Sequence, residues 1–179
     1  MILAMVKRLA GMIGLAVAMP AVFLLYVPLR GNLWHWIHGD HVTYRQWTIR
    51  IPDGFYVKQG NKGMFLWKLT FGYPLWRGPY VMVGFSELPY VFDSAADYNK
   101  FAAGSELAAA TEGYRPIGAT DVQAGKNQAH CLEYTLPNNQ SRHFVQCAVE
   151  HTTLLIGYRG DAMYIPAVQS VLASLSQAP

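Results

Sequence analysis

Four side chains that could ligate a metal lie within residues 35–41. They are His35, His38, Asp40 and His41. Histidines three positions apart on a helix can present two imidazoles on one face, and a carboxylate could complete a zinc-type shell. The same residues also suit a polar segment at a membrane interface. Because no second cluster of ligating residues completes the shell, we expect no metal and no other cofactor, and His35, His38 and His41 remain the candidates for such a site.

Cys131 and Cys147 are the only cysteines of the chain, and they lie symmetrically about Asn139. In a hairpin centred on Asn139 they would face each other on antiparallel strands, with Cα atoms about 4.5 Å apart. An oxidising compartment would permit the bond, and otherwise both would serve as small buried apolar residues. We predict a disulfide if the domain lies outside the cytoplasm. His130 is adjacent to Cys131 but should point to the opposite face of its strand, so we expect no catalytic thiol.

The familiar catalytic motifs are absent from the sequence. It contains no Gly-x-Ser-x-Gly, no phosphate-binding glycine loop, no His-Glu-x-x-His and no paired Cys-x-x-Cys. A serine or carboxylate could act outside such motifs, but nothing in the chain marks one. We therefore expect a protein that is not an enzyme.

A loop rich in glycine and proline, residues 72–79, carries Tyr73, Leu75, Trp76 and Arg77. Large aromatic side chains beside an arginine are typical of the residues that dominate binding at protein interfaces. These side chains could equally fold back as a small satellite core. We predict that this loop contacts a partner, with Trp76 as its main residue.

The apolar segment that precedes the histidines is long enough to cross a membrane. Residues 9–29 carry no charge, and a helix of this length spans about 32 Å, close to a hydrocarbon core of about 30 Å. Tyr26, Trp34 and Trp36 lie at or just past its end, as aromatic residues at a membrane interface do. We predict a transmembrane anchor over residues 1–30.

A cleaved signal peptide is the alternative, because Ala16-Val17-Ala18 has the small-x-small pattern of a cleavage site. Cleavage there would leave the strongest apolar run, residues 21–29, exposed near the new terminus, which favours the anchor. Lys7 and Arg8 precede the segment and only Arg30 directly follows it. This bias places the N-terminus in the cytoplasm and the body in the periplasm or a lumen, on a single-pass protein of the cell inner membrane.

The rest of the chain has no net charge. The formal charge of +3 comes from Lys7, Arg8 and Arg30, whereas the chain from Gly31 onward has as many acidic as basic residues. A neutral body lacks the clustered cations that bind phosphates, so we expect no nucleic-acid partner.

We divide the body into a juxtamembrane tether, residues 31–43, and one domain, residues 44–179. Alternating and helical patterns predict strands, a helix, strands and a last helix. The expected strands are 44–52, 64–71, 80–85, 117–122, 129–136, 142–150 and 152–158, and the expected helices are 94–111 and 165–175. Separate runs of strands and helices indicate an α+β domain with a mainly antiparallel sheet.

This layout resembles the PsbP-like domain family, which includes extrinsic photosystem II proteins, bacterial relatives and Ran-binding Mog proteins. The matching stretches are Trp47–Gly54, Gly125–Tyr134, Thr153–Tyr158 and Val171–Leu175. The resemblance implies an antiparallel sheet flanked by helices on both sides and an accessory or binding role without a common catalytic site.

The first functional hypothesis is therefore an accessory or assembly subunit of a membrane protein complex, held in the bilayer and binding its partner through the extracytoplasmic domain. A stand-alone surface module that binds a small ligand or lipid is the second hypothesis. An anchored hydrolase is the third.

Overall fold

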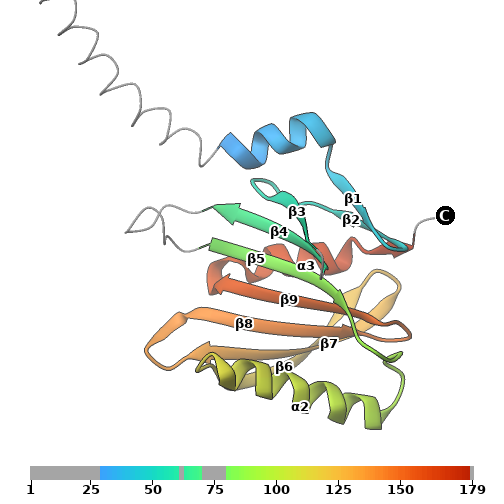
Figure 1. Cartoon of the computed structure of the whole chain (residues 1–179), viewed down its shortest axis with the longest axis vertical. Coiled ribbons are helices and arrows are strands. Elements are labelled where there is room, and N and C mark those ends of the chain that lie inside the picture. Colours follow the sequence, from blue (N-terminus) through green and yellow to red (C-terminus); the bar gives the residue numbers. More distant parts are fainter. Residues whose placement is uncertain (1–28, 61–62, 70–79, 178–179) are drawn as a thin grey trace, which may run out of the picture.

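The structure is a computed structural model, and it describes residues 29–60, 63–69 and 80–177 (Figure 1). The described chain begins with helical residues 29–38. The further elements are β1 His41–Tyr44, β2 Trp47–Arg50, β3 Tyr56–Gly60, β4 Gly63–Leu69, β5 Tyr80–Glu87, α2 Ala95–Thr111, β6 Arg115–Ala124, β7 Asn127–Leu136, β8 Asn139–Val149, β9 Leu154–Asp161, a 3-10 turn Ala162–Tyr164, α3 Ile165–Ala173 and β10 Ser176–Gln177.

The strands form two sheets in which every described pair is antiparallel. The larger sheet has seven strands in the order β3-β4-β5-β9-β8-β7-β6, and the smaller has three in the order β1-β2-β10. Strand β9 therefore lies between β5 and β8, and the two halves of the large sheet join there. The prediction of an α+β domain with a mainly antiparallel sheet is confirmed.

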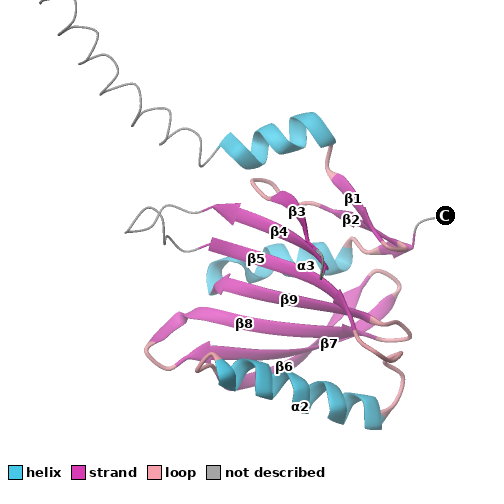
Figure 2. Ribbon diagram, viewed as in Figure 1, coloured by secondary structure: helices cyan, strands magenta, loops and turns pink. Residues whose placement is uncertain are grey.

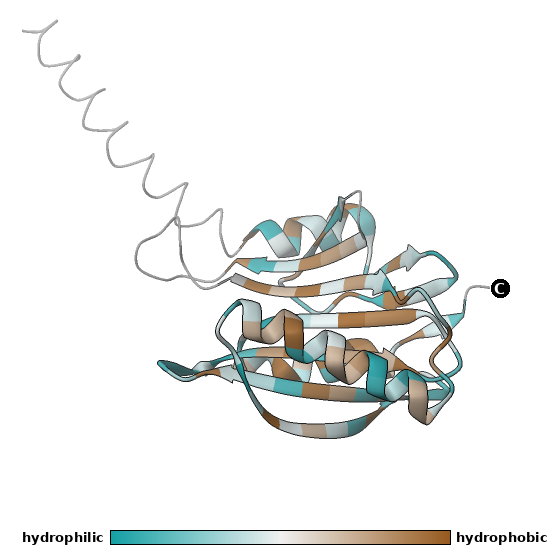
Figure 3. Cartoon of the chain, turned by 60° about the horizontal axis from the view of Figure 1, so that its bottom comes forward, coloured by the Kyte–Doolittle hydropathy of each residue, from teal (hydrophilic) through white to brown (hydrophobic). Residues whose placement is uncertain are grey.

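Helices α2 and α3 cover opposite faces of the large sheet (Figures 1 and 2). Successive side chains of β8 point to opposite faces of the sheet, and both faces are covered. Val145 and Cys147 face the main core with α3, whereas Phe144 and Ala148 face α2. Figure 3 shows hydrophobic residues, in brown, along the strands of the sheet.

A side-chain cap at Ser94 marks the start of α2. The Ser94 hydroxyl accepts a hydrogen bond from the Asp97 amide at 3.2 Å and donates one to the Asp97 carboxylate at 2.6 Å. The helix ends at Thr111 with Glu112 as its C-cap, and Gly113 follows with a φ of 80°, as glycine does after many helices. Proline occupies the first turn of α3.

The predicted tether, residues 31–43, is instead ordered structure. Residues 29–38 are helical and pack on the domain, and β1 pairs with β2 across a turn at Arg45, whose φ is 56°. The predicted strand 44–52 is therefore the second half of a hairpin. Strands β3 and β10 were not predicted, because the exposed end of β3 and the two residues of β10 carry no clear alternation.

Within the described part of the chain, no helix is both long and apolar enough to cross a membrane. The predicted anchor lies outside the described residues except for its last positions, so it remains a prediction.

Candidate functional site: a cleft around His130

An open cleft of about 530 Å³ lies at the start of α2. Three parts of the chain meet there: the segment that leads into α2, the middle of the β6–β7 hairpin, and the turn after β8. The lining residues are Phe92, Asp93, Ser94, Ala95, Tyr98, Ala119, Thr120, Asp121, His130, Glu150 and His151. None of them is a lysine or an arginine, whereas three are carboxylates.

His130 lies between two carboxylates. Its Nδ1 is 2.6 Å from Asp121 and its Nε2 is 2.8 Å from Glu150. Asp121 is the residue opposite His130 in the β6–β7 register, so the hairpin itself creates the first contact. Glu150 lies just past β8, and its amide donates a hydrogen bond to the Gln128 carbonyl at 2.9 Å. Both carboxylates are thus held by the backbone of the strands.

This arrangement stabilises the charged form of the imidazole. Burial alone is the largest influence on the pKa of His130 and lowers it. The hydrogen bond with Glu150 and the negative charge of Asp121 act in the opposite direction and together raise the pKa above its ordinary value. Only the imidazolium can donate from both ring nitrogens at once, which is what the two carboxylates require.

Aromatic rings form the inner wall of the cleft. The ring centroids of Phe92 and Tyr98 lie 5.4 and 6.0 Å from that of His130. Phe92 is buried and also contacts Phe101 of α2 edge-on, with centroids 5.7 Å apart. The wall is therefore anchored in the small core between α2 and the sheet.

A second histidine–carboxylate pair lies at the rim. His151 Nδ1 is 2.6 Å from Asp93, and the side chain of His151 is 73% exposed. The backbone fixes this pair, because the His151 amide donates to the Phe92 carbonyl at 3.0 Å and the Phe92 amide donates to the Thr152 carbonyl at 2.9 Å. His151 adopts a φ of 59°, a left-handed conformation that is uncommon outside glycine.

Comparison with known proteins supports the fold seen here. No family model and no curated protein matches the chain. Among solved structures, the solution structure of cyanobacterial PsbP (CyanoP) from Synechocystis sp. PCC 6803 matches with a TM-score of 0.50 and 16% identity. The match covers 76% of this chain and 91% of that one. The domain has a PsbP-like fold. At this level of identity the similarity concerns the fold alone.

The predicted disulfide of the PsbP-like domain is confirmed. Cys131 and Cys147 are direct partners in the β7–β8 register, and their sulfur atoms are 2.07 Å apart. The bond lies on the α3 side of the sheet, away from the His130 cleft. The prediction that His130 and Cys131 point to opposite faces is therefore also confirmed.

Two of the three candidate metal-ligating histidines, His35 and His38, have partners among the described residues. His35 Nδ1 lies 2.9 Å from the Asp40 carboxylate and its Nε2 lies 3.1 Å from the Pro52 carbonyl, whereas His38 stacks on Trp34 with ring centroids 4.8 Å apart. Across residues 29–60, 63–69 and 80–177, no group of three or more metal-ligating side chains converges. His35 therefore takes part in the docking of the helix on the domain, whereas the contacts of His38 are to Trp34 of its own helix.

The predicted membrane-interface residues differ in how exposed they are in the structure. Trp34 is half-buried against the main core, whereas Trp36 is 84% exposed. Tyr26 lies outside the described residues. So do all four residues of the predicted partner-binding loop, which are Tyr73, Leu75, Trp76 and Arg77.

Sequence reasoning did not identify the His130 cleft. One signal was present: a two-residue turn at Gly125-Lys126 places Asp121 opposite His130, as the structure confirms. The Asp93–His151 pair gave no such signal, because 58 residues separate its members and neither belongs to a motif.

Proposed function

We propose that this protein is a non-catalytic, membrane-anchored accessory subunit of a membrane protein complex, and that its PsbP-like domain binds the partner through the His130 cleft. The observation that carries the proposal is the composition of that cleft. Asp93, Asp121 and Glu150 line it beside aromatic rings. These three carboxylates outnumber the two lining histidines, His130 and His151, so the lining keeps a net negative charge even where both imidazoles are charged, and it contains no lysine or arginine.

The state of His130 supports a binding role over a catalytic one. A general base needs a ring nitrogen with a free lone pair to accept a proton. Both nitrogens of His130 lie within 2.8 Å of a carboxylate and act as donors in the charged form. The neighbouring hydroxyl of Ser94 is engaged in capping α2. The cleft thus lacks an activated nucleophile of the Ser–His kind.

The chemistry of the cleft indicates the kind of group it accepts. Carboxylates beside aromatic faces attract an ammonium or a guanidinium group, through charge and through the rings. A lysine or arginine of a partner subunit would satisfy both features. Individual contacts of this kind are weak, but a shared membrane raises the effective concentration of the partner.

The disulfide supports a location outside the cytoplasm. Such bonds persist in the periplasm or in oxidising lumens and are rare in the cytosol. The charges of Lys7 and Arg8 before the apolar segment agree with a cytoplasmic N-terminus. The family resemblance to extrinsic photosystem II proteins supports an accessory role on that side of the membrane. We therefore propose a single-pass inner-membrane protein with a periplasmic or lumenal domain.

Site-specific photo-crosslinking in native membranes tests the proposal. A photoreactive residue at Ala119, an exposed position of the cleft outside both ion pairs, should give one discrete larger species. Leu107 on α2 is the matched control, because it is 71% exposed and does not line the cleft. Asp121→Asn combined with Glu150→Gln should reduce the Ala119 adduct. Absence of the adduct, or equal yields from both positions, would refute the role of the cleft.

A further inference from the structure

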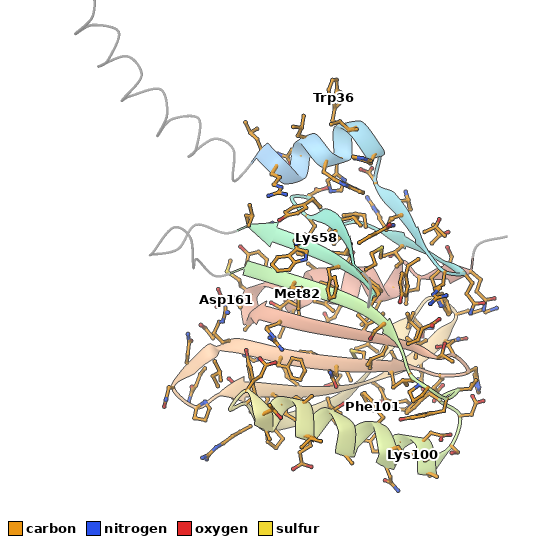
Figure 4. All side chains as sticks on the ribbon, viewed as in Figure 1. Trp36, Lys58, Met82, Lys100, Phe101 and Asp161 are labelled. Atoms are coloured by element: carbon orange, nitrogen blue, oxygen red, sulfur yellow. A yellow bond between two sulfur atoms is a disulfide. The ribbon has the colours of Figure 1, made fainter. Side chains whose placement is uncertain are left out.

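The helical residues 29–38 expose an apolar surface. Leu29, Leu33, Trp36 and Ile37 follow the i, i+4, i+7, i+8 spacing that places side chains on one helical face. All four are exposed, from 51% for Leu29 and Leu33 to 84% for Trp36. Figure 4 shows Trp36 pointing away from the domain. We call these four residues the outer face.

The opposite side of the helix fixes it to the domain. A Cβ atom on Gly31 would lie 2.2 Å from the Gly54 carbonyl oxygen, so the helix backbone contacts the turn after β2 directly. His35 Nε2 lies 3.1 Å from the Pro52 carbonyl, and Trp34 packs against the main core. A helix held this closely cannot rotate to bury its outer face, so the exposure is a property of the folded domain.

An apolar groove with basic residues runs beside the helix. It has a volume of about 480 Å³ and lies between the helix and the pair β3–β4. Val57, Trp67 and Leu69 contribute apolar surface to it. Arg30 lies over the Tyr56 ring at 4.2 Å, and Lys58 lies 5.8 Å from the centroid of the Trp67 ring. The described lining residues include no carboxylate.

We propose that the outer face and this groove form one docking surface that lies on a bilayer containing anionic phospholipids. The proposal rests on the membrane anchor proposed above. The uncharged segment 9–29 ends where the helix begins, so the anchor delivers the outer face to the interface. An amphipathic helix there buries its apolar side at the acyl boundary, and tryptophan favours the same depth. Arg30 and Lys58 then meet the phosphates of the headgroups.

This docking sets the orientation of the whole domain. The helix contacts the turn after β2 and the groove borders β3, which is one edge strand of the large sheet. Strand β6, at the other edge, carries Asp121 of the His130 cleft. A domain that lies on its β3 edge therefore presents the cleft away from the bilayer, where the body of a membrane complex can reach it.

Fluorescence quenching in proteoliposomes tests the docking surface with the full chain. Leu33→Cys carries an NBD label on the outer face, and Leu107→Cys carries the same label on α2 as the control, since both side chains are exposed. Vesicles contain brominated lipid, with either phosphatidylcholine alone or phosphatidylcholine mixed with phosphatidylglycerol. We expect the label at position 33 to be quenched several-fold more than the label at position 107, with stronger quenching in the anionic vesicles.

Further variants and controls separate the possible outcomes. Trp36→Glu combined with Ile37→Glu changes exposed side chains only and should abolish the quenching at position 33 while leaving the melting temperature unchanged. Vesicles that float with the protein while the label at 33 stays unquenched would overturn the docking and leave the anchor intact. A protein that does not float with any vesicle would overturn both. Equal quenching in both lipid mixtures would refute the role of the cations.

Discussion

Removal of the Cys131–Cys147 disulfide should lower the stability of the domain by an amount that follows from its position. The two residues are 16 apart in sequence. In the chain-entropy model, a closed loop of this size restricts the unfolded chain by about 3 kcal/mol. For a chain of this length each kcal/mol corresponds to roughly 2–4 °C of melting temperature. We therefore expect a decrease of about 9 °C when the bond is absent.

Two comparisons distinguish the effect of the bond on stability from the effect of the packing of its sulfur atoms. Reduction of the native protein removes the bond alone, because both thiols remain in the core. The double change Cys131→Ala and Cys147→Ala also removes two buried sulfur atoms beside a cavity of about 60 Å³. The variant should therefore melt below the reduced protein. Circular dichroism melting of the oxidised, reduced and variant proteins, with thiol titration, makes the measurement.

The reasoning fails if the reduced protein melts within about 2 °C of the oxidised one, a difference of less than about 1 kcal/mol. In that case the β7–β8 hairpin would hold the two positions together in the unfolded chain without the bond. Two free thiols in denatured, unreduced protein would contradict the structure itself.

Two further predictions concern a glycine pair and the pH dependence. Gly125→Ala should destabilise the domain by more than about 1 kcal/mol, because its φ is 58° and a Cβ atom would lie 2.0 Å from the Leu175 carbonyl oxygen. Gly104→Ala, in the exposed middle of α2 with nothing within 4 Å, should stabilise it by about 0.5–1 kcal/mol; urea unfolding of both variants checks the opposite signs. Because the pKa of His130 is raised in the folded domain, its contribution to stability is present below the unfolded pKa of about 6.5 and is lost as pH rises through the folded value. The difference in melting temperature between the native protein and His130→Gln should therefore be larger at pH about 5.5 than at pH about 8.5, and a constant difference would exclude the ion pairs as its cause.

Local sequence patterns determined much of the sheet and α2. Ser94 and Asp97 mark the start of α2 through contacts three residues apart, and the structure has the same bonds. The placement of the cysteines about Asn139 predicted that Cys131 and Cys147 face each other in the β7–β8 hairpin, and the structure confirms this pair. These features depend on residues that are close in the chain, where backbone geometry restricts the possible pairings.

Tertiary packing decided the features that carry the proposals. Residues 31–43 have a weak pattern of their own, yet they are ordered by contacts with distant parts of the chain. The helix contacts the turn after β2 through Gly31 and His35, and β1 pairs with β2. Because one side of that helix packs on the domain, Trp34 is half-buried and Trp36 is exposed. The sequence alone does not show which of the two tryptophans faces the domain.

The His130 cleft shows the same division within one site. The sequence by itself determined that Asp121 faces His130, since a two-residue turn sets the register of their hairpin. Only the tertiary structure decided that the Glu150 carboxylate contacts the other ring nitrogen of His130 and that Asp93 forms an ion pair with His151. Those contacts depend on how α2 and the turn after β8 pack on the sheet, and a contact between distant segments leaves no periodicity in either of them.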